Sequence, residues 1–452
     1  MPEQKGKRII ILGGGFGGMY TAVNLRKLLP REEGHEILVV SRDNFLLFTP
    51  MLHEVASSDL ELTNIVTPLR KMVRHCQFFH GDVERIDLAA RKVWLSHGFD
   101  HHGHEMSYDY LVIALGSVTN YYNLPGVAER SVQMKSLGDA IHLRNRMIGL
   151  LEEADTECAA GVREPLMTVV VAGGGFAGVE TIGGINDFLR ESLRFYTNID
   201  EKMLRMVLVT PLPLILTELG ESLGRYAQKK LQMRGVDIRT GIGVTKFGPE
   251  GVTLSDGSTI KTNTLIWTAG TSAHPLLATL PCKLERGRVV VNAALEVPDY
   301  PGVFALGDCA VVPDKRTGKP HPPTAQHALR EAKVCAHNIA VEIRGGKKKE
   351  FDFKMLGQLA AIGRRAGVAE ILGMKFSGLP AWFLWRSIYL MKLPRFDRKV
   401  RVALDWTLDL FFGKDLVQYQ TIRSEAMSAE LADGGKMMPA IRTECADADS
   451  VH

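Results

Sequence analysis

The chain contains two short apolar runs that end in the same pattern of glycines. The run "RIIIL" covers residues 8–12, and the run "VVVA" covers residues 169–172. The glycines are Gly13, Gly15 and Gly18 after the first run, and Gly173, Gly175 and Gly178 after the second. Beyond them, apolar residues recur at helical spacing, in "MYTAVNLRKLL" and again in "VETIGGINDFL". Each pattern therefore predicts a strand, a tight turn and a helix.

The glycine spacing is GxGxxG, which is typical of a dinucleotide-binding turn. The first glycine permits the turn, the second lets the backbone approach a pyrophosphate, and the third lets the helix pack on the strand. The pyrophosphate then lies at the helix N-terminus, where free N–H groups and the helix dipole favour negative charge. One match is a weak signal, but two in the same order predict two dinucleotide sites. Two such sites indicate electron transfer between a resident flavin and an exchanging nicotinamide.

A third segment indicates which loop holds which nucleotide. "YPGVFALGDCA" (300–310) is an apolar strand that ends in Gly307 and Asp308. It resembles the FAD-contacting motif of flavoproteins with two dinucleotide sites, whose aspartate binds the ribityl chain, although a strand followed by Gly-Asp is also a plain turn. In that superfamily the FAD domain is split, and its second part follows an inserted NADH domain. The order here matches, so the first loop is expected to hold FAD and the second NADH.

The expected fold is α/β, with two Rossmann-like dinucleotide-binding domains and a C-terminal membrane-associating region. The crossings between the split FAD domain and the inserted NADH domain are expected at "YDYLVIALGSVTN" (108–120) and "TLIWTAGTSAHP" (264–275), where Gly270 is assigned to the NADH site. The predicted boundaries are 1–120 for the first part of the FAD domain, 121–270 for the NADH domain, 271–345 for the second part of the FAD domain, 346–424 for an amphipathic membrane-anchoring region and 425–452 for a mobile tail.

Both sites depart from the usual pattern at the end of the next strand. An acidic residue normally binds the ribose hydroxyls there, but "EILVVSRDN" places Ser41 and "MVLVTPLP" places Thr210 at that position. At the FAD site, the Ser41 hydroxyl or Asp43 is expected to substitute. At the second site, the missing carboxylate removes the usual repulsion of a 2′-phosphate, yet no arginine stands beside Thr210 to attract one. NADH is the preferred donor over NADPH, but this residue does not decide the choice.

Several longer segments are specific to one family of flavoproteins. The disulfide reductases need a redox cysteine pair near the first FAD helix, and "LLFTPMLHEVASSDLE" has none. Instead, "FLLFTPMLHEVASSDLELTNIVTPLR", "GGGFAGVET", "HPPTAQHALREA" and "GQLAAIGRRAGVAE…FSGLPAWFLWRSIYLMKL" together resemble a type II NADH dehydrogenase across residues 7–415. That resemblance implies bound FAD, hydride transfer from NADH, and reduction of a membrane quinone without proton pumping.

The resemblance assigns roles to three further residues. Glu180, in "AGVE", matches a residue near the nicotinamide and flavin that steers protons or the quinone. Its alternative is a first-turn carboxylate favoured by the helix dipole. Gln326, in "TAQ", matches the quinone-site glutamine, and Ala325 belongs to the same FAD-proximal motif. Thr324 and Gln326 are equally suited to cap the following helix. Glu180 and Gln326 are the candidate catalytic residues.

The C-terminal region is aromatic, then basic and amphipathic. In "LPAWFLWRSIYLMKLPRF" (379–396), the first stretch of roughly 14 mostly apolar residues is too short to span a bilayer. In "DRKVRVALDWTLDLFFGKD" (397–415), a helix places Val400, Leu404, Leu408 and Phe411 on one side. This composition suits the lipid headgroup zone, so a peripheral membrane protein is expected, on the cytoplasmic face of the cell membrane if the source is bacterial. The alternative is a helix pair packed on the body or forming a homodimer interface.

Charge and cysteine content bear on which partners and metal sites the sequence predicts. The formal net charge is only +4, so no nucleic-acid partner is predicted. The six cysteines have no metal-ligand spacing, so no metal site is predicted. Two other hypotheses stay open: a sulfide:quinone oxidoreductase, which needs cysteines at the flavin whereas Cys158 lies in an apparent linker, and a flavin- and NADH-binding redox sensor.

Overall fold

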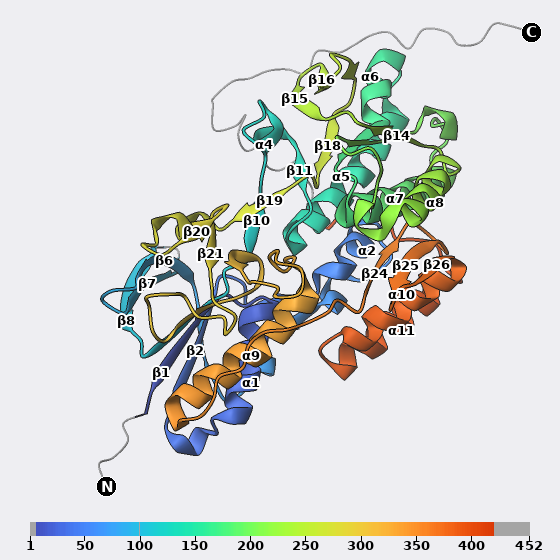
Figure 1. Ribbon diagram of the computed structural model, residues 1–452. Coiled ribbons are helices and arrows are strands. Elements are labelled where there is room, and N and C mark those ends of the chain that lie inside the picture. Colours follow the sequence, from blue (N-terminus) through green and yellow to red (C-terminus); the bar gives the residue numbers. More distant parts are fainter. Residues whose placement is uncertain (1–5, 99, 420–452) are drawn as a thin grey trace, which may run out of the picture.

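Two five-stranded parallel sheets organise the structure (Figure 1). The computed structural model describes residues 6–98 and 100–419, so the predicted tail at 425–452 lies outside the described residues. The first sheet has the order β22-β9-β1-β2-β5. Its strands are β22 (Val303–Ala305), β9 (Tyr110–Ile113), β1 (Arg8–Leu12), β2 (Glu36–Ser41) and β5 (Gln77–His80). Because β22 joins this sheet late in the chain, the first Rossmann-like unit is split.

The second sheet repeats this plan with its own strands. Its order is β11-β18-β12-β13-β14, and every neighbouring pair is parallel. The strands are β11 (Val132–Gln133), β18 (Thr264–Trp267), β12 (Thr168–Ala172), β13 (Arg205–Thr210) and β14 (Val236–Thr240). The two glycine loops follow the central strands β1 and β12, so both predicted strand–turn–helix units are confirmed.

The two sheets are linked by a pair of crossing strands. β10 (Ser117–Thr119) and β19 (Thr271–Ala273) pair antiparallel between the halves of the molecule. These strands lie in the two segments predicted as crossings. The boundaries at 120, 270 and 345 themselves stay predictions.

Helices cover both sheets. α1 (Phe16–Leu28) and α9 (Ala325–Arg344) lie side by side in the half that contains the first sheet (Figure 1). In the other half, α5 (Leu137–Thr156), α7 (Phe176–Ser192) and α8 (Gly220–Gln232) surround the second sheet.

The C-terminal region is more than a pair of helices. It starts with an antiparallel sheet of β24 (Gly357–Ala361), β25 (Gly367–Ile371) and β26 (Met374–Gly378), which the sequence pattern did not predict. Then follow α10 (Leu379–Lys392) and α11 (Phe396–Leu408). Among the described residues, no helix combines the length and apolar character needed to cross a bilayer.

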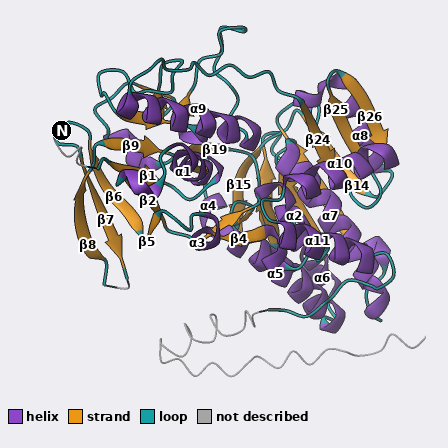
Figure 2. Ribbon diagram, turned by 90° about the horizontal axis from the view of Figure 1, so that it is seen from below, coloured by secondary structure: helices purple, strands orange, loops and turns teal. Residues whose placement is uncertain are grey.

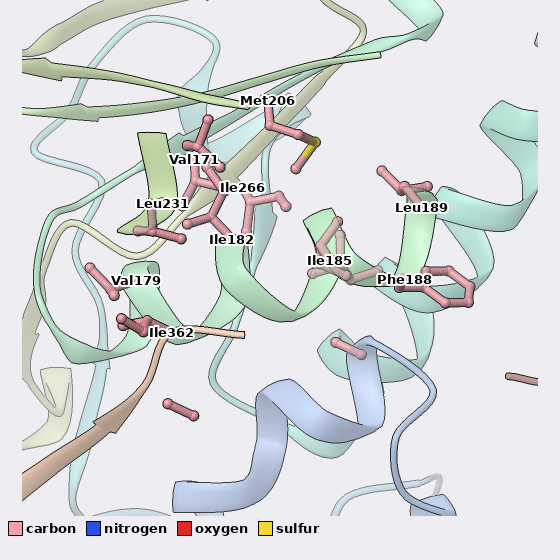
Figure 3. Packing of buried hydrophobic residues seen from close by; sticks show 14 of the residues in the cluster. Val171, Val179, Ile182, Ile185, Phe188, Leu189, Met206, Leu231, Ile266 and Ile362 are labelled. Atoms are coloured by element: carbon pink, nitrogen blue, oxygen red, sulfur yellow. The ribbon is translucent and has the colours of Figure 1, made fainter. Parts of the chain in front are cut away.

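One hydrophobic core joins the half that contains the second sheet to the C-terminal region. Val171, Ile182 and Ile362 belong to it (Figure 3). Trp385 of α10 and Val402 of α11 are also part of this core. So is α2 (Leu52–Ala56), although it precedes residue 120 in the chain. Figure 2 shows α10 and α11 beside α2 and α7.

The remaining elements are peripheral to these layers. They include a three-stranded antiparallel sheet, β6 (Asp82–Asp87), β7 (Lys92–His97) and β8 (His102–Ser107), and a second one, β15 (Val244–Gly248), β16 (Gly251–Leu254) and β17 (Thr259–Ile260). Smaller strands are β3 (Phe45–Leu47), β4 (Val66–Pro68), β20 (Leu284–Glu285), β21 (Arg288–Val290) and β23 (Ala310–Val311). Short helices are α3 (Leu69–Met72), α4 (Val127–Arg130) and α6 (Ala160–Leu166).

Candidate active site

The first glycine loop leaves open space where a dinucleotide pyrophosphate would lie. Gly13 has φ +116°, and a side chain there would overlap the carbonyl of Ala114. A Cβ at Gly18 would overlap the Gly13 carbonyl, so this glycine allows α1 to pack against the loop. A Cβ at Gly15, the N-cap of α1, would meet nothing within 4 Å. The three glycines thus fit the bend, approach and packing that a pyrophosphate requires.

The second loop has the same construction. Gly173 has φ +123°, and a Cβ there would meet Thr268 of the neighbouring segment. Gly178 is closed in by the Gly173 carbonyl, whereas a Cβ at Gly175 would meet nothing within 4 Å. Gly175 is the N-cap of α7 and makes no side-chain cap, so the free N–H groups of the first turn face this space.

The structure places the strand-end residues beside their loops. Ser41 ends β2, and its Oγ is the first atom that a Cβ at Gly14 would meet. Thr210 ends β13 next to Gly174, and its Oγ1 accepts a hydrogen bond of 3.3 Å from the Leu212 N–H. Both hydroxyls therefore lie at the positions where ribose recognition is expected, and neither position carries a negative charge.

Gly270 lies at the junction of the two halves. Its carbonyl accepts a hydrogen bond of 3.1 Å from the Asn120 N–H, and a Cβ there would run into the Tyr122 ring. Thr268, two residues earlier, closes off Gly173. The segment that carries Gly270 therefore borders the second loop.

Asp308 is held from two other segments of the chain. Its Oδ2 accepts a hydrogen bond of 2.8 Å from Ser117 Oγ on β10. The preceding N–H, of Gly307, donates to Glu331 Oε2 at 2.7 Å. Burial raises the pKa of Glu331 to about 7, although the Gly307 N–H opposes this shift. The plain-turn interpretation does not account for these contacts, which fix the aspartate beside α9.

Gln326 does not cap its helix. Its Nε2 donates to the Gly357 carbonyl at 2.8 Å, and its buried Oε1 has no hydrogen-bond partner among the described residues. Thr324 is the N-cap by position but makes no side-chain cap bond; its hydroxyl lies 2.8 Å from His327 Nδ1. The capping alternative is therefore wrong for both residues. A buried amide oxygen without a partner suits a ligand that brings a donor. Ala325 is the first residue of α9.

Glu180 faces the C-terminal region rather than the start of its own helix. Its Oε1 accepts hydrogen bonds from the Ala361 N–H at 3.2 Å and from Trp385 Nε1 at 3.0 Å. Burial raises the pKa of this carboxyl to about 8, and the two hydrogen bonds only partly oppose the shift. The first-turn alternative is wrong, since α7 starts at Phe176 and has no acidic residue in its first turn. Near neutral pH, Glu180 therefore holds a proton.

Two buried neighbours of Glu180, His53 and Glu54, were not predicted from the sequence. His53 Nδ1 lies 3.8 Å from Glu180 Oε2, and burial lowers the pKa of His53 to about 4. Since His53 is then neutral and Glu180 protonated near pH 7, the two are not an ion pair. Burial also raises the pKa of Glu54, whose Oε2 accepts a 2.9 Å hydrogen bond from Trp406 Nε1. The sequence feature that could have indicated them is the adjacent His-Glu pair inside the otherwise apolar run "PMLHEVA".

Strand β24 connects the two candidate catalytic residues. Gln326 binds the carbonyl of its first residue, Gly357, and Glu180 binds the N–H of its last residue, Ala361. Four residues of extended strand separate these contacts, which is about 13 Å along the backbone. The structure thus brings both residues to the inner edge of one C-terminal strand.

Aromatic side chains line the same interior. Phe48 makes edge contacts with Phe16, next to the first loop, and with Tyr389 of α10, at centroid distances of 6.0 and 6.1 Å. The rings of Tyr389 and Trp385 are 4.9 Å apart. Burial raises the pKa of Tyr389, and the nearby Glu180 adds to the shift. These rings thus form a packed apolar interior between the first loop and Glu180.

The outer face of the C-terminal helices is apolar and exposed. On α11, Leu404 and Leu408 are 56% and 52% exposed, and Phe411 beyond it is 77% exposed. At the start of α10, Phe376, Leu379, Pro380, Phe383 and Leu384 line an apolar hollow of about 510 Å³. The predicted apolar side of 397–415 therefore points away from the body, while Val402 and Trp406 pack inward.

Comparison with known proteins places this architecture in a family. Residues 7–332 match the pyridine nucleotide-disulphide oxidoreductase model, and residues 355–415 match the NDH2 C-terminal domain. The chain is 33% identical over 417 residues to the type II NADH:quinone oxidoreductase Ndh of Mycobacterium tuberculosis, covering 89% of this chain and 87% of the relative. The chain belongs to the type II NADH:quinone oxidoreductase family. A probable NADH dehydrogenase of Dictyostelium discoideum is 31% identical, with 91% of each chain covered.

Solved structures agree with the fold. The structure of NDH2 from Plasmodium falciparum in complex with NADH matches with a TM-score of 0.84 at 19% identity, covering 91% of this chain and all of that one. The sulfide:quinone oxidoreductase of Aquifex aeolicus matches with a TM-score of 0.66 at 21% identity, over 90% and 95% of the two chains. At these identities the solved structures show the fold alone, and the sequence relatives show the family.

Proposed function

We propose that this chain carries out NADH:quinone oxidoreduction, the activity of the family to which it belongs, with FAD at the first glycine loop and NADH at the second. The observation that carries the proposal is the joint placement of Glu180 and Gln326 along β24, in a chain with two glycine loops that are each open at their second glycine. Bound FAD would supply the chemistry that accepts a hydride from NADH and passes two electrons to a quinone.

The chain's own residues bind and orient the reactants in this proposal. Gly15 and Gly175 let backbone N–H groups approach the two pyrophosphates, and Asp308 holds the ribityl chain. The buried Oε1 of Gln326, which has no partner among the described residues, accepts a hydrogen bond from the bound ligand. The apolar interior between Phe16 and Trp385 excludes water from the reacting atoms.

Glu180 is proposed to supply a proton. Reduction of a quinone by NADH consumes one proton beyond the transferred hydride. Because Oε1 of Glu180 accepts two hydrogen bonds, its proton resides on Oε2, the oxygen nearer to His53. A carboxyl with a pKa of about 8 releases this proton readily near neutral pH and recovers it from solvent.

The exposed apolar face is proposed to rest on a lipid surface, which would make the protein peripheral to the membrane, on the cytoplasmic side in a bacterium. The support is the exposure of Leu404, Leu408 and Phe411 together with the basic side chains Arg398, Lys399 and Arg401 of the same helix. Aromatic and apolar groups favour the acyl boundary, and cations favour anionic headgroups. Burial of the same face in a homodimer is the competing explanation.

The sulfide:quinone alternative finds little support in the thiols. Cys309, next to Asp308, is buried, and burial raises the pKa of its thiol to about 11. Persulfide chemistry needs a thiolate, which this environment disfavours. Turnover with sulfide but none with NADH would nevertheless favour that activity.

The direct test uses the purified flavoprotein without oxygen. NADH is expected to bleach the bound flavin in a stopped-flow instrument, and a short-chain quinone is expected to restore its colour. Flavin that NADH fails to reduce would overturn the proposal. Normal reduction without steady-state turnover on any quinone would instead support the redox-sensor hypothesis.

A further inference from the structure

A lysine of the nicotinamide half reaches toward the FAD-site aspartate. Lys135 lies in the short segment between β11 and α5, and its Nζ donates to Ser117 Oγ at 2.6 Å. Ser117 is on the crossing strand β10, and its Oγ donates to Asp308 Oδ2 at 2.8 Å. Since a hydroxyl has one proton and two lone pairs, it can accept from the ammonium and donate to the carboxylate at the same time. The three groups therefore form one directed chain of hydrogen bonds.

The backbone at Lys135 is fixed by the start of α5. Ser136 caps the helix by accepting from the Asp139 N–H at 3.1 Å, and the Asp139 carboxylate accepts from the N–H groups of Ser136 and Lys135 at 2.6 and 3.0 Å. The capping box and the bond from the Lys135 N–H thus fix the backbone from which the Lys135 side chain starts.

The charges explain why a cation is useful here. Burial lowers the pKa of Lys135, and the Asp308 carboxylate opposes that shift. On its other side, Asp308 faces the buried Glu331, whose pKa is raised by burial and, in part, by Asp308. A second acidic group, Glu331, therefore binds the Gly307-Asp308 turn, and Lys135 is a cation linked to Asp308 through Ser117. Charge-assisted hydrogen bonds of this kind fix side-chain geometry more strongly than neutral ones.

We propose that Lys135 is a positioning residue for FAD, which acts through Ser117 to hold the Asp308 carboxylate in one orientation. Retention of the flavin then depends on a residue from the nicotinamide half, across the β10–β19 crossing. This inference rests on the proposed binding of the FAD ribityl chain by Asp308. Lys135 itself need not touch the cofactor.

The test measures how fast the diluted holoenzyme releases FAD, followed by the fluorescence of free flavin. Lys135→Met is expected to speed release about ten- to a hundredfold, as expected for the loss of a charged hydrogen bond. Lys135→Arg, which keeps a donor and the charge, is expected to stay within about threefold of the wild type. Lys246→Met, an exposed lysine on β15, is the matched control and is expected to release FAD at the wild-type rate.

A double-mutant cycle with Asp308→Asn separates positioning from a merely structural effect. If Lys135 acts through Asp308, adding Lys135→Met to Asp308→Asn accelerates release no further. An undiminished effect in that background would overturn the inference, and so would wild-type release by Lys135→Met. Wild-type release by Asp308→Asn alone would overturn the assignment of Asp308 to FAD, and this inference with it. Thermal melting of each apoprotein identifies any variant whose faster release reflects unfolding.

Discussion

At the scale of single residues, the two loops differ in what surrounds them rather than in their glycines. Gly15 and Gly175 have nearly the same backbone, with φ of −74° and −79°. Both face open space, and neither needs the left-handed conformation. A Cβ at either position therefore meets no protein atom within 4 Å and enters the space proposed for the ligand.

Valine at these positions should separate the two sites. Gly175→Val is expected to abolish reduction of the flavin by NADH while FAD stays bound, because the new side chain fills the space for the nicotinamide pyrophosphate. Gly15→Val is the matched variant and is expected to lose FAD. Absorbance of the purified proteins and stopped-flow reduction measure both outcomes. The reverse pattern would mean that the two nucleotides are assigned to the wrong loops.

Glu180 should control the pH dependence of turnover. Glu180→Gln keeps the acceptor for Ala361 and Trp385 but cannot release a proton, so quinone turnover is expected to fall about 10²- to 10⁴-fold. Reduction of the flavin by NADH is expected to change little. Wild-type turnover should decline above about pH 8, where Glu180 ionises, and the variant should lack this decline. Glu221→Gln on the surface of α8 is the control, and equal pH profiles for wild type and Glu180→Gln would contradict the proton role.

The same carboxyl should affect stability. Its pKa in the folded protein, about 8, is above the usual 4.5, so the folded state binds a proton that the unfolded state has lost. The stabilisation of the folded state that comes from the protonated Glu180 carboxyl is fully present below pH 4.5 and is lost as pH rises through 8. Glu180→Gln is therefore expected to gain unfolding free energy relative to wild type between these limits. Chemical denaturation at a series of pH values measures the difference, and a constant difference would contradict the raised pKa.

At the scale of elements, α10 and α11 have two different faces. Trp385 and Trp406 point inward and donate to the buried carboxyls of Glu180 and Glu54. The opposite face is apolar and exposed. Removal of the whole region would open the shared core, so deletion is a poor test of membrane binding. Substitutions on the outer face are a better test because they leave the contacts of Trp385 and Trp406 with Glu180 and Glu54 in place.

Three glutamates on the outer face should release the protein from lipid. The triple variant Leu404→Glu, Leu408→Glu and Phe411→Glu is expected to lose most binding to anionic vesicles, because it removes apolar area and adds negative charge. Turnover with a water-soluble quinone should be unchanged. The control carries Met203→Glu, Leu212→Glu and Met233→Glu, three exposed apolar positions in the half that contains the second sheet. Unchanged vesicle flotation together with a loss of dimer would favour the homodimer interface instead.

At the scale of the whole molecule, the sequence predicted what depends on local geometry. Both glycine loops with their strands and helices follow from short-range spacing, whereas the late return of the segment with Asp308 was implied by the resemblance to flavoproteins with two dinucleotide sites. The partners of Glu180 lie 181 and 205 residues away in the chain, so no local pattern could place Ala361 and Trp385 beside it. The capping alternative failed at Gln326 because its side chain makes a tertiary contact to Gly357 instead, and at Thr324 because its hydroxyl lies beside His327 Nδ1 and makes no cap bond. Strands β24–β26 were missed because short strands between glycines carry little periodicity.

The whole molecule should work as one path from NADH through FAD to quinone. Anaerobic stopped-flow mixing of the purified protein with NADH, followed by a quinone, tests that path most directly. The account predicts loss of the oxidised flavin absorbance with NADH and its full return with quinone, both fast enough to support steady-state turnover. Flavin that stays oxidised in the presence of NADH would contradict it.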